Sequence, residues 1–392
     1  MFSIRTYDTI SESGLANFPR KTYTLGETDA PDAILLRSHD LHTTLLPRSV
    51  LAVARAGAGV NNIPVSSCSK HGIVVFNTPG ANANSVKELV ICGMLLASRR
   101  IVEGITWVRS LDADQSDVPG LIERAKKRFK GPEIMGKTLG VIGLGAIGVA
   151  VANAGSALGM HVVGHDPFIT VQSAWGLSSD VQRAGDLEDL LGQSDYVTIH
   201  APLNDQTRDL IGETQFRQMK PGVRLLNFAR GGLVQRSALL DALDSGTLAS
   251  YVTDFVDAEL ALHAKVLPVP HLGASTPEAE ANCAKMAVRQ LRDYLERGTV
   301  TNSVNFPEIL LPPRPDTYRI QIVNRNEPGM IKQLAAVLAQ NGMNIANLVN
   351  KGRDLLAYNI IDVGSAVDHE VLAQLRAIDG VIRVRSTEPL RT

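Results

Sequence analysis

A glycine-rich turn between a short apolar strand and a helix is the feature that most restricts how this chain can fold. Leu139 to Ile142 run into Gly143-x-Gly145-x-x-Gly148, and a helix-like run follows from Val149 to Leu158. A second apolar run ends at Asp166, 18 residues after Gly148. This order of strand, glycine turn, helix, strand and acid predicts a βαβ unit of a parallel α/β sheet that binds a dinucleotide.

Each position of the turn has a physical role in such a unit. Gly143 permits the tight turn, Gly145 lets the backbone approach a pyrophosphate, and Gly148 lets the helix pack closely on the strand. The helix start then offers free N–H groups to the phosphates. A carboxylate at Asp166 would accept both ribose hydroxyls and repel a 2′-phosphate, so we expect NAD rather than NADP. The alternative is a glycine turn that only packs a βα unit.

Composition limits the remaining classes of function. A chain of 392 residues with 44% hydrophobic and 20% charged residues is expected to form two or three domains with large cores. Its net charge of −1 gives no overall attraction to nucleic acid or membrane. The longest apolar run, Leu89 to Ala97, is too short to cross a bilayer. The three cysteines lie far apart in the sequence, which predicts reduced thiols, a cytoplasmic protein and no metal site.

Further short apolar runs predict more strands of parallel sheets. They lie at residues 33–36, 51–54 and 74–76 before the glycine turn, and at 196–199, 224–228 and 251–254 after it. Ser85 to Arg100 is expected to form a long, apolar helix at a domain or subunit junction. Ligands gather at the carboxyl ends of such strands, so His200, Arg230 and Asp254 are candidate site positions.

A Pro-rich stretch, Leu311 to Pro315, predicts a linker to a third region. Beyond it the pattern is strand, helix, two strands, helix and strand, which is the ferredoxin-like βαββαβ order. We therefore expect two doubly wound, Rossmann-like α/β domains and a ferredoxin-like domain. The expected boundaries are 1–95 with 275–310 for a substrate-binding domain, 96–274 for the NAD-binding domain, 311–316 for the linker and 317–392 for the third domain.

Three side chains have the chemistry of a hydride-transfer site. The guanidinium of Arg230 can grip a substrate carboxylate by two hydrogen bonds. His271 can exchange the hydroxyl proton when a 2-hydroxy acid becomes a 2-keto acid, and Glu259 can hold the His271 ring and stabilise its cation. Asp254 can accept from the carboxamide of the cofactor. Each of these residues alone is more often a solvated or structural side chain, so only the set of them together indicates a hydride-transfer site.

The motifs together resemble those of the D-isomer-specific 2-hydroxyacid dehydrogenases over essentially the whole chain. They are Asn77-Thr-Pro79, the glycine turn, Asn227-Phe-Ala-Arg-Gly-Gly232, Asp254 with Glu259, and His271-Leu-Gly-Ala-Ser-Thr276. The form of the last motif, with Val304-Asn-Phe-Pro307, is similar to the branch that oxidises 3-phosphoglycerate to 3-phosphohydroxypyruvate in L-serine biosynthesis. The C-terminal region resembles an ACT domain through Asn324-x-Asn326-Glu-Pro-Gly329 and Gly342-Met-Asn344.

The resemblance implies roles for named positions. Arg230, Glu259 and His271 match the catalytic residues. The positions that match the cofactor lining are Thr78, Gly143, Gly145, Ala146, Ile147, Gly148, Asp166, Pro202, Phe228, Ala229, Arg230, Asp254, His271 and Gly273. Asn326 and Asn344 match positions that bind a serine effector in regulated relatives, and Asn324 stands where some relatives have His. The alternative for these amides is capping of a helix and a turn. The family expectation is a homodimer or homotetramer.

Some positions depart from the family pattern. Ala146 replaces a residue that can contact the pyrophosphate, Leu260 replaces a Pro, and the segment from Glu259 to His271 is short. Arg37 and Arg55 follow apolar strands, where an unpaired charge is unfavourable, and we expect them to bind the substrate phosphate with Arg230 on the carboxylate. Two other functions stay open. One is a dehydrogenase for glycerate, glyoxylate or 2-hydroxyglutarate, and the other is a non-enzymatic NADH-sensing regulator.

Overall fold

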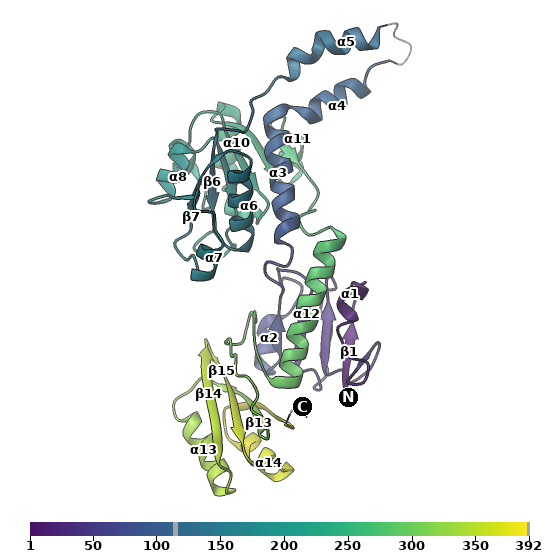
Figure 1. Ribbon diagram of the computed structural model, residues 1–392, viewed down its shortest axis with the longest axis vertical. Helices are drawn as coiled ribbons and strands as arrows, with labels where there is room; N and C mark the ends of the chain where they lie inside the picture. The colour runs from purple at the N-terminus through teal and green to yellow at the C-terminus, as the bar shows by residue number, and fades with distance from the viewer. Residues whose placement is uncertain (113–116, 390–392) are drawn as a thin grey trace. The chain divides into compact units, whose positions relative to one another are not determined.

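The structure is a computed structural model that describes residues 1–112 and 117–389. It divides into two compact units (Figure 1). The first combines residues 1–81 with 280–392, and the second is the continuous segment 82–279. No helix among the described residues is both long and apolar enough to cross a membrane.

The first unit contains a five-stranded, all-parallel sheet in the order β2-β1-β3-β4-β5. The predicted strands 33–36, 51–54 and 74–76 are β3 (Ala33–Leu36), β4 (Ala52–Arg55) and β5 (Val74–Phe76). Two strands, β1 (Phe2–Thr6) and β2 (Tyr23–Leu25), were not predicted. Only Ile4 of β1 is fully buried, so β1 has no continuous apolar run. The order is that of a flavodoxin-like doubly wound sheet.

The long helix α12 (Pro277–Arg297) completes this sheet's core and was also not predicted. Its inner face, from Cys283 to Leu295, packs with apolar side chains of β1, β3, β4 and β5. The shorter helices of this part are α1 (Glu12–Leu15) and α2 (Val65–Lys70). A Cβ on Gly14 would lie 2.4 Å from the Cβ of Ala284, so α1 and α12 approach too closely for any larger residue there.

The second unit is a seven-stranded, all-parallel sheet in the order β12-β11-β10-β9-β6-β7-β8. Its strands are β6 (Thr138–Ile142), β7 (His161–His165), β8 (Gln182–Arg183), β9 (Tyr196–Ile199), β10 (Val223–Asn227), β11 (Leu248–Thr253) and β12 (Val266–Pro268). Helices cover both faces (Figure 1). One core joins α3 (Ala83–Arg99) and α6 (Ala146–Ala157) to the sheet. The other joins α8 (Leu187–Gln193), α9 (Glu213–Gln218) and α10 (Arg236–Ser245) to it.

The helices α4 (Ile101–Arg109) and α5 (Val118–Ala125) have no buried residue, and neither has the short α7 (Val171–Trp175). A 3-10 turn, η1 (Lys126–Phe129), follows α5. Arg100, with φ of 47°, separates α3 from α4, so the predicted helix ends where expected and a second helix begins at once. Figure 1 draws α4 and α5 as an arm that extends away from the sheet. The remaining short elements are η2 (Gly231–Leu233) and α11 (Ala258–Leu262).

The C-terminal region has the predicted βαββαβ order. Its elements are β13 (Tyr318–Arg325), α13 (Met330–Gln340), β14 (Ile345–Arg353), β15 (Leu356–Val363), α14 (His369–Ala377) and β16 (Val381–Thr387). The antiparallel order β14-β15-β13-β16 is ferredoxin-like. The predicted fold class, two Rossmann-like domains and a ferredoxin-like domain, is therefore confirmed.

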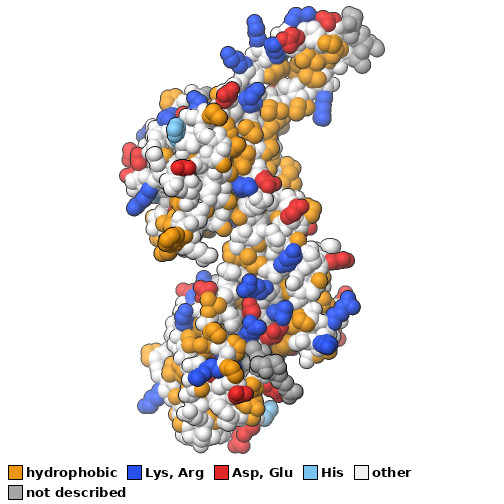
Figure 2. Space-filling view, in the orientation of Figure 1, with side chains coloured by type: hydrophobic (Ala, Val, Ile, Leu, Met, Phe, Trp, Pro, Cys, Tyr) orange, Lys and Arg blue, Asp and Glu red, His pale blue; other side chains and the backbone are white. Residues whose placement is uncertain are grey.

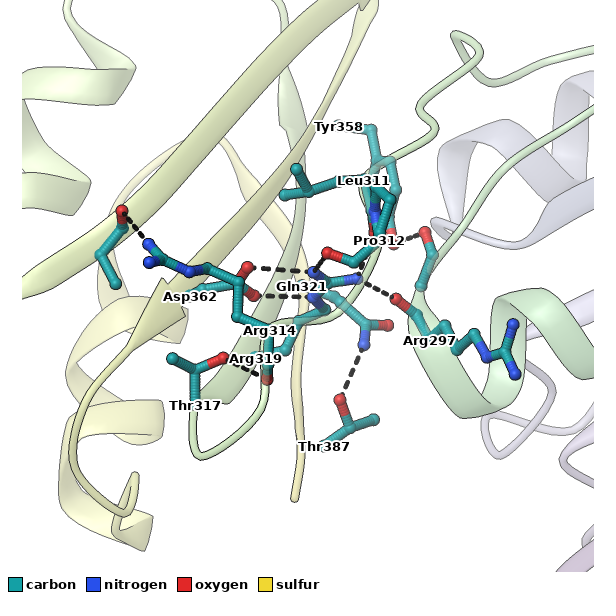
Figure 3. Close-up of polar contacts among 12 residues, drawn as sticks. Arg297, Leu311, Pro312, Arg314, Thr317, Arg319, Gln321, Tyr358, Asp362 and Thr387 are labelled. Atoms are coloured by element: carbon teal, nitrogen blue, oxygen red, sulfur yellow. Dashed lines mark hydrogen bonds and ion pairs between the residues drawn. The ribbon is translucent and has the colours of Figure 1, made fainter. Parts of the chain in front are cut away.

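This C-terminal sheet is covered on both faces. The helices α13 and α14 pack on Ile320, Ile322 and Ile361. The opposite face, with Tyr358 and Ile360, joins the core around Tyr294 of α12. Polar groups complete this junction, because Arg319 binds Asp362 within the sheet and donates to the carbonyl oxygens of Arg297, Leu311 and Pro312 (Figure 3). Tyr358 donates to the carbonyl of Gly298 at 2.8 Å.

Candidate active site

The glycine turn lies between β6 and α6, as the sequence predicts, and its glycines differ in what they touch. A Cβ on Gly148 would lie 1.9 Å from the carbonyl oxygen of Gly143, so packing of helix on turn requires glycine there. Gly143 has φ of 88°, in the left-handed region. A Cβ on Gly145 would meet no atom within 4 Å, and no side chain caps the start of α6. The turn therefore leaves open space and first-turn N–H groups where a pyrophosphate would bind.

Asp166 follows β7 beside this turn. Its Oδ2 accepts from the Leu144 N–H at 2.8 Å, and its Oδ1 accepts from the Phe168 N–H at 2.8 Å. Each carboxylate oxygen keeps a further lone pair for a ribose hydroxyl. Ala146 is exposed and Ile147 is half-buried, both in the first turn of α6.

Asp254 follows β11 and carries two unpaired acceptors. Its residue is 8% exposed, and neither carboxylate oxygen has a hydrogen-bond partner among the described residues. Burial raises the pKa of Asp254, and the positive charges of His271 and Arg230 offset part of that rise. A buried carboxylate without donors fits a ligand that brings its own N–H groups, as a nicotinamide carboxamide does. The glycine turn, Asp166 and Asp254 thus fit NAD.

The turn that carries Arg230 is held by Asn227, the last residue of β10. The Asn227 Oδ1 accepts from the N–H groups of Ala229 and Arg230 at 3.1 and 3.3 Å, and its Nδ2 donates to the Arg230 carbonyl at 2.9 Å. Arg230 is exposed, and within the described residues its guanidinium donates only to the carbonyl of Ala229. Its guanidinium therefore keeps donors for a substrate carboxylate.

His271 lies beyond β12, and its nearest ring is Phe255. The two ring centroids are 4.9 Å apart at 85°, an edge-to-face contact. Gly273 of the same loop is buried, and a Cβ there would lie 4.0 Å from Asp254 Oδ2. The structure thus places Asp254, Arg230 and the 271–273 loop together at the carboxyl ends of β10 and β11.

Glu259 lies in α11, and its carboxylate binds Arg236 rather than His271. The Glu259 Oε2 accepts from Arg236 Nη2, and no hydrogen bond joins Glu259 to His271 in the described part of the chain. Its side chain is 60% exposed. The predicted contact between these two residues is therefore absent from this arrangement, and Arg236, which was not predicted, takes its place.

The other predicted cofactor positions lie beside these strands. Pro202 follows β9, while Phe228 and Ala229 follow β10, with Phe228 buried against α3 through Gly93. His200, at the end of β9, has its Nε2 3.0 Å from Thr198 Oγ1, and burial lowers its pKa to about 4. Thr78 belongs to the first unit, where it is fully buried and its Oγ1 has no partner among the described residues.

The predicted phosphate ligands also belong to the first unit. Arg37, after β3, forms an ion pair with Glu280 of α12 at 2.6 Å. Its charge is therefore already compensated, contrary to the expectation of an unpaired cation. Arg55, at the end of β4, donates from Nε to the Arg37 carbonyl at 2.8 Å and from Nη1 to the Gly59 carbonyl at 2.7 Å. The structure thus brings the two arginines together.

The three predicted effector amides lie in different environments. Asn324 is 1% exposed, accepts from Asn359 Nδ2 and donates to the Arg325 carbonyl, both at 2.6 Å. Asn326 is exposed and donates to the Asp354 carbonyl at 3.2 Å. Asn344 is exposed just before β14. The contacts of Asn324 belong to the interior of the sheet.

Comparison with known proteins places this site in a family. Residues 91–276 match the model of the D-isomer specific 2-hydroxyacid dehydrogenase NAD binding domain. The D-3-phosphoglycerate dehydrogenase of Escherichia coli K12 is 34% identical over 341 residues, which cover 83% of this chain and 79% of that protein. The chain belongs to the D-isomer-specific 2-hydroxyacid dehydrogenase family. Its second unit contains the family's NAD-binding domain.

Other members of the family differ in length. The D-3-phosphoglycerate dehydrogenase of Methanocaldococcus jannaschii is 33% identical over 320 residues, 78% of this chain. The chain spans 58% of the length of this relative and 52% of the length of the relative from Archaeoglobus fulgidus. It spans 46% of the length of the relative from Rattus norvegicus. A solved glyoxylate reductase from Paecilomyes thermophila has a TM-score of 0.64 at 26% identity, covering 77% of this chain and 98% of its own. The fold is also that of an NAD-bound 3-phosphoglycerate dehydrogenase from Entamoeba histolytica, with a TM-score of 0.59 at 23% identity. That match covers 78% of this chain and 98% of the other.

Proposed function

We propose that this protein catalyses the NAD-dependent oxidation of 3-phospho-D-glycerate to 3-phosphohydroxypyruvate, the first step of L-serine biosynthesis. The observation that carries the proposal is the grouping of Asp254, Arg230 and the His271 loop at the carboxyl ends of β10 and β11. The relatives named D-3-phosphoglycerate dehydrogenase support this substrate over other 2-hydroxy acids.

In this proposal each side chain has one task. Arg230 binds the substrate carboxylate, since its guanidinium has donors to spare. His271 removes the proton of the C2 hydroxyl as the C2 hydride leaves, and Glu259 stabilises the imidazolium that forms. Bound NAD would supply the hydride acceptor. Asp254, whose two carboxylate oxygens have no partner among the described residues, would hold the carboxamide of the nicotinamide. Arg55 and Arg37 bind the phosphate. For this, Arg37 must either contact the phosphate and Glu280 together or give up its ion pair with Glu280.

The test is a set of initial rates with NADH and a panel of 2-oxo acids. The panel contains phosphohydroxypyruvate, hydroxypyruvate, glyoxylate and 2-oxoglutarate. We expect the highest kcat/KM with phosphohydroxypyruvate and a loss of at least about 100-fold in turnover for His271→Ala with NADH binding retained. Arg55→Gln should raise KM for phosphohydroxypyruvate much more than KM for hydroxypyruvate. A preference for an unphosphorylated acid would instead support the alternative of a glycerate, glyoxylate or 2-hydroxyglutarate dehydrogenase.

A non-enzymatic NADH sensor is the alternative from another class. Such a protein would bind NADH and yet turn over none of the four acids. The uncapped start of α6 and the unpaired Asp254 would serve either function. The exposed Arg230 and His271 favour the enzyme, because a sensor needs neither a carboxylate grip nor a base.

We propose that a second copy of this chain covers the arm formed by α4 and α5. Its exposed apolar residues are Ile101, Val102, Ile105, Val108 and Ile122, each more than one-third exposed. Figure 2 shows hydrophobic side chains gathered over this arm, with Lys and Arg around them. Exposed apolar surface of this extent on two helices without a buried residue is typical of an interface. The expected product is a homodimer or homotetramer.

We further propose an L-serine effector at the C-terminal domain, which would then act as an ACT domain. The exposed amides of Asn326 and Asn344 support this proposal, whereas the buried contacts of Asn324 favour a structural role for it. Inhibition by L-serine that is lost in Asn326→Ala, and that D-serine in the same buffer does not cause, would support it. A cytoplasmic location is proposed on the three free cysteines, Cys68, Cys92 and Cys283.

A further inference from the structure

Arg236, the first residue of α10, contacts two acidic side chains of the segment that carries Glu259. Its Nε donates to Asp257 Oδ2 at 2.6 Å, and its Nη2 donates to Glu259 Oε2. The Arg236 side chain is 51% exposed. An ordinary exposed ion pair contributes little, but one planar fork that joins two carboxylates fixes both of them in orientation.

Asp257 connects Arg236 to the backbone of α11. It is the N-cap of that helix, and its Oδ1 accepts from the N–H groups of Glu259 and Leu260 at 3.0 and 2.9 Å. The hydrogen bond from Arg236 and those from the Leu260 and Glu259 backbone lower the pKa of Asp257. Asp257 is therefore charged near neutral pH and binds Arg236 and the helix start at the same time.

The helix that carries Glu259 has little else to hold it. It spans five residues, Ala258–Leu262, and only Leu260 of these is buried. A helix of this length is not stable by itself. The N-cap and Arg236 are thus the contacts that determine where the Glu259 carboxylate lies.

The side chain of Phe255 lies between Arg236 and His271. Arg236 and Phe255 line the same cavity of about 370 Å³. The other contact of the Phe255 ring is the edge-to-face one with His271 at 4.9 Å. Phe255 packs on Gly231 as well, because a Cβ added to Gly231 would lie 3.2 Å from the Phe255 Cβ. The segment 255–260 is therefore placed between α10 and the His271 loop.

We propose that Arg236 is a positioning residue for the reaction. It holds Glu259 through Oε2, which leaves Oε1 to accept from His271 when substrate and cofactor are bound. This inference rests on the proposed function for the roles of Glu259 and His271, and it adds a residue that is not part of that catalytic set. It also explains how a segment shortened between Glu259 and His271 keeps its carboxylate in place.

Removal of Arg236 should lower the rate and leave substrate binding nearly unchanged. Without Arg236 the Glu259 carboxylate is no longer held where His271 can reach it, so the imidazolium that forms during oxidation loses a stabilising charge. Arg230, and not Glu259, binds the substrate carboxylate, so KM should change little. We expect a decrease in kcat of roughly ten-fold from misplacement of Glu259.

The experiment compares Arg236→Gln, Arg236→Lys and a matched control in the full chain. The control is Arg217→Gln, because Arg217 forms an exposed pair with Glu213 within α9, and among the described residues its side chain bonds no site residue. Measurements are kcat and KM with the 2-hydroxy acid that the unsubstituted protein oxidises best, together with hydrogen–deuterium exchange of peptide 255–263. Arg236→Lys keeps the charge but reaches one carboxylate, so it should restore only part of kcat.

The outcomes separate this inference from the proposed function. A lower kcat at a nearly unchanged KM and faster exchange of 255–263 in Arg236→Gln, with none of these changes in Arg217→Gln, would support a positioning role. An unchanged kcat in an active protein would overturn it, even if stability fell. If the unsubstituted protein oxidises no 2-hydroxy acid, the proposed function fails. The exchange then decides alone: faster exchange supports Arg236 as the anchor of Glu259, and unchanged exchange overturns it.

Discussion

Arg319 and Asp362 form a two-point ion pair in the interior of the first unit, Nε to Oδ1 at 2.7 Å and Nη2 to Oδ2 at 3.0 Å. Their side chains are 4% and 1% exposed. The three remaining N–H groups of Arg319 donate to backbone carbonyls at the end of α12 and in the following linker (Figure 3). All five donors of the guanidinium are satisfied, which is the condition under which such a pair is tolerated in a core.

Removal of one partner should therefore destabilise the first unit strongly. Arg319→Met leaves Asp362 buried and unpaired, and we expect a loss of about 3–5 kcal/mol. The double variant Arg319→Met with Asp362→Leu should lose less than Arg319→Met alone. Urea denaturation followed by circular dichroism measures both. A double variant as unstable as the single one would mean that the carbonyl contacts, and not the ion pair, carry the effect.

Two glycines of the cofactor turn should respond in opposite ways to the same substitution. Gly148→Ala places a Cβ 1.9 Å from the Gly143 carbonyl oxygen, so it should disturb the fold of the turn and lower the melting temperature. Gly145→Ala meets nothing within 4 Å and has an ordinary φ of −74°. It should keep the melting temperature and raise the Kd for NADH by roughly ten-fold, because the methyl group lies on the path of the pyrophosphate. Fluorescence titration with NADH and calorimetry of both variants test the contrast.

Asp254 should make the protein without cofactor less stable than its asparagine variant at neutral pH. Burial raises the pKa of Asp254 in the folded state above its unfolded value. The charged Asp254 carboxylate therefore lowers the free energy of unfolding at pH values above its folded pKa. This destabilisation disappears as the pH falls below the pKa of Asp254 in the unfolded chain. Asp254→Asn should stabilise the protein by on the order of 1 kcal/mol at pH 7 and by nothing near pH 3. Melting curves across this range are the measurement, and an equal gain at both ends would contradict a charge effect.

His200 should give the second unit an acid-sensitive window. Burial lowers its pKa to about 4, below the usual value of 6.5. The unfolded chain thus binds a proton at a higher pH than the folded one, and stability falls as pH decreases from 6.5 towards 4. His200→Gln, which can still bond Thr198, should flatten the stability curve in that window. A curve as steep as that of the unsubstituted protein would assign the acid sensitivity to other groups.

Local signals in the sequence predicted the five central strands of the second unit and two of its helices, α3 and α6. The glycine turn, β6, α6 and β7 need only short-range patterns, and the continuous apolar runs of β9, β10 and β11 are those of strands buried on both faces. The strand β1 has no such run, since Ile4 is its only fully buried residue, and it belongs to the sheet through pairing with β2 and β3. Pairing with distant strands is not visible in a local pattern.

For the candidate site too, local motifs identified residues but not their partners from distant segments. Motif positions predicted Asp254, Arg230 and the His271 loop, and the structure brings these together. The partners of Glu259 and Arg37 could not be predicted, because Arg236 and Glu280 reach them from helices distant in sequence. Asn227 was part of a recognised motif, yet its role as the hydrogen-bond centre of the Arg230 turn required the geometry.

The discontinuity of the first unit has a consequence for synthesis of the chain on the ribosome. Residues 82–279 form one continuous unit and can fold as soon as they emerge. The first 81 residues cannot complete their core at that stage, because α12 supplies its inner face from Cys283 to Leu295. The strands β1, β3, β4 and β5 therefore precede the second unit along the chain and can complete their core only after α12 has emerged behind it.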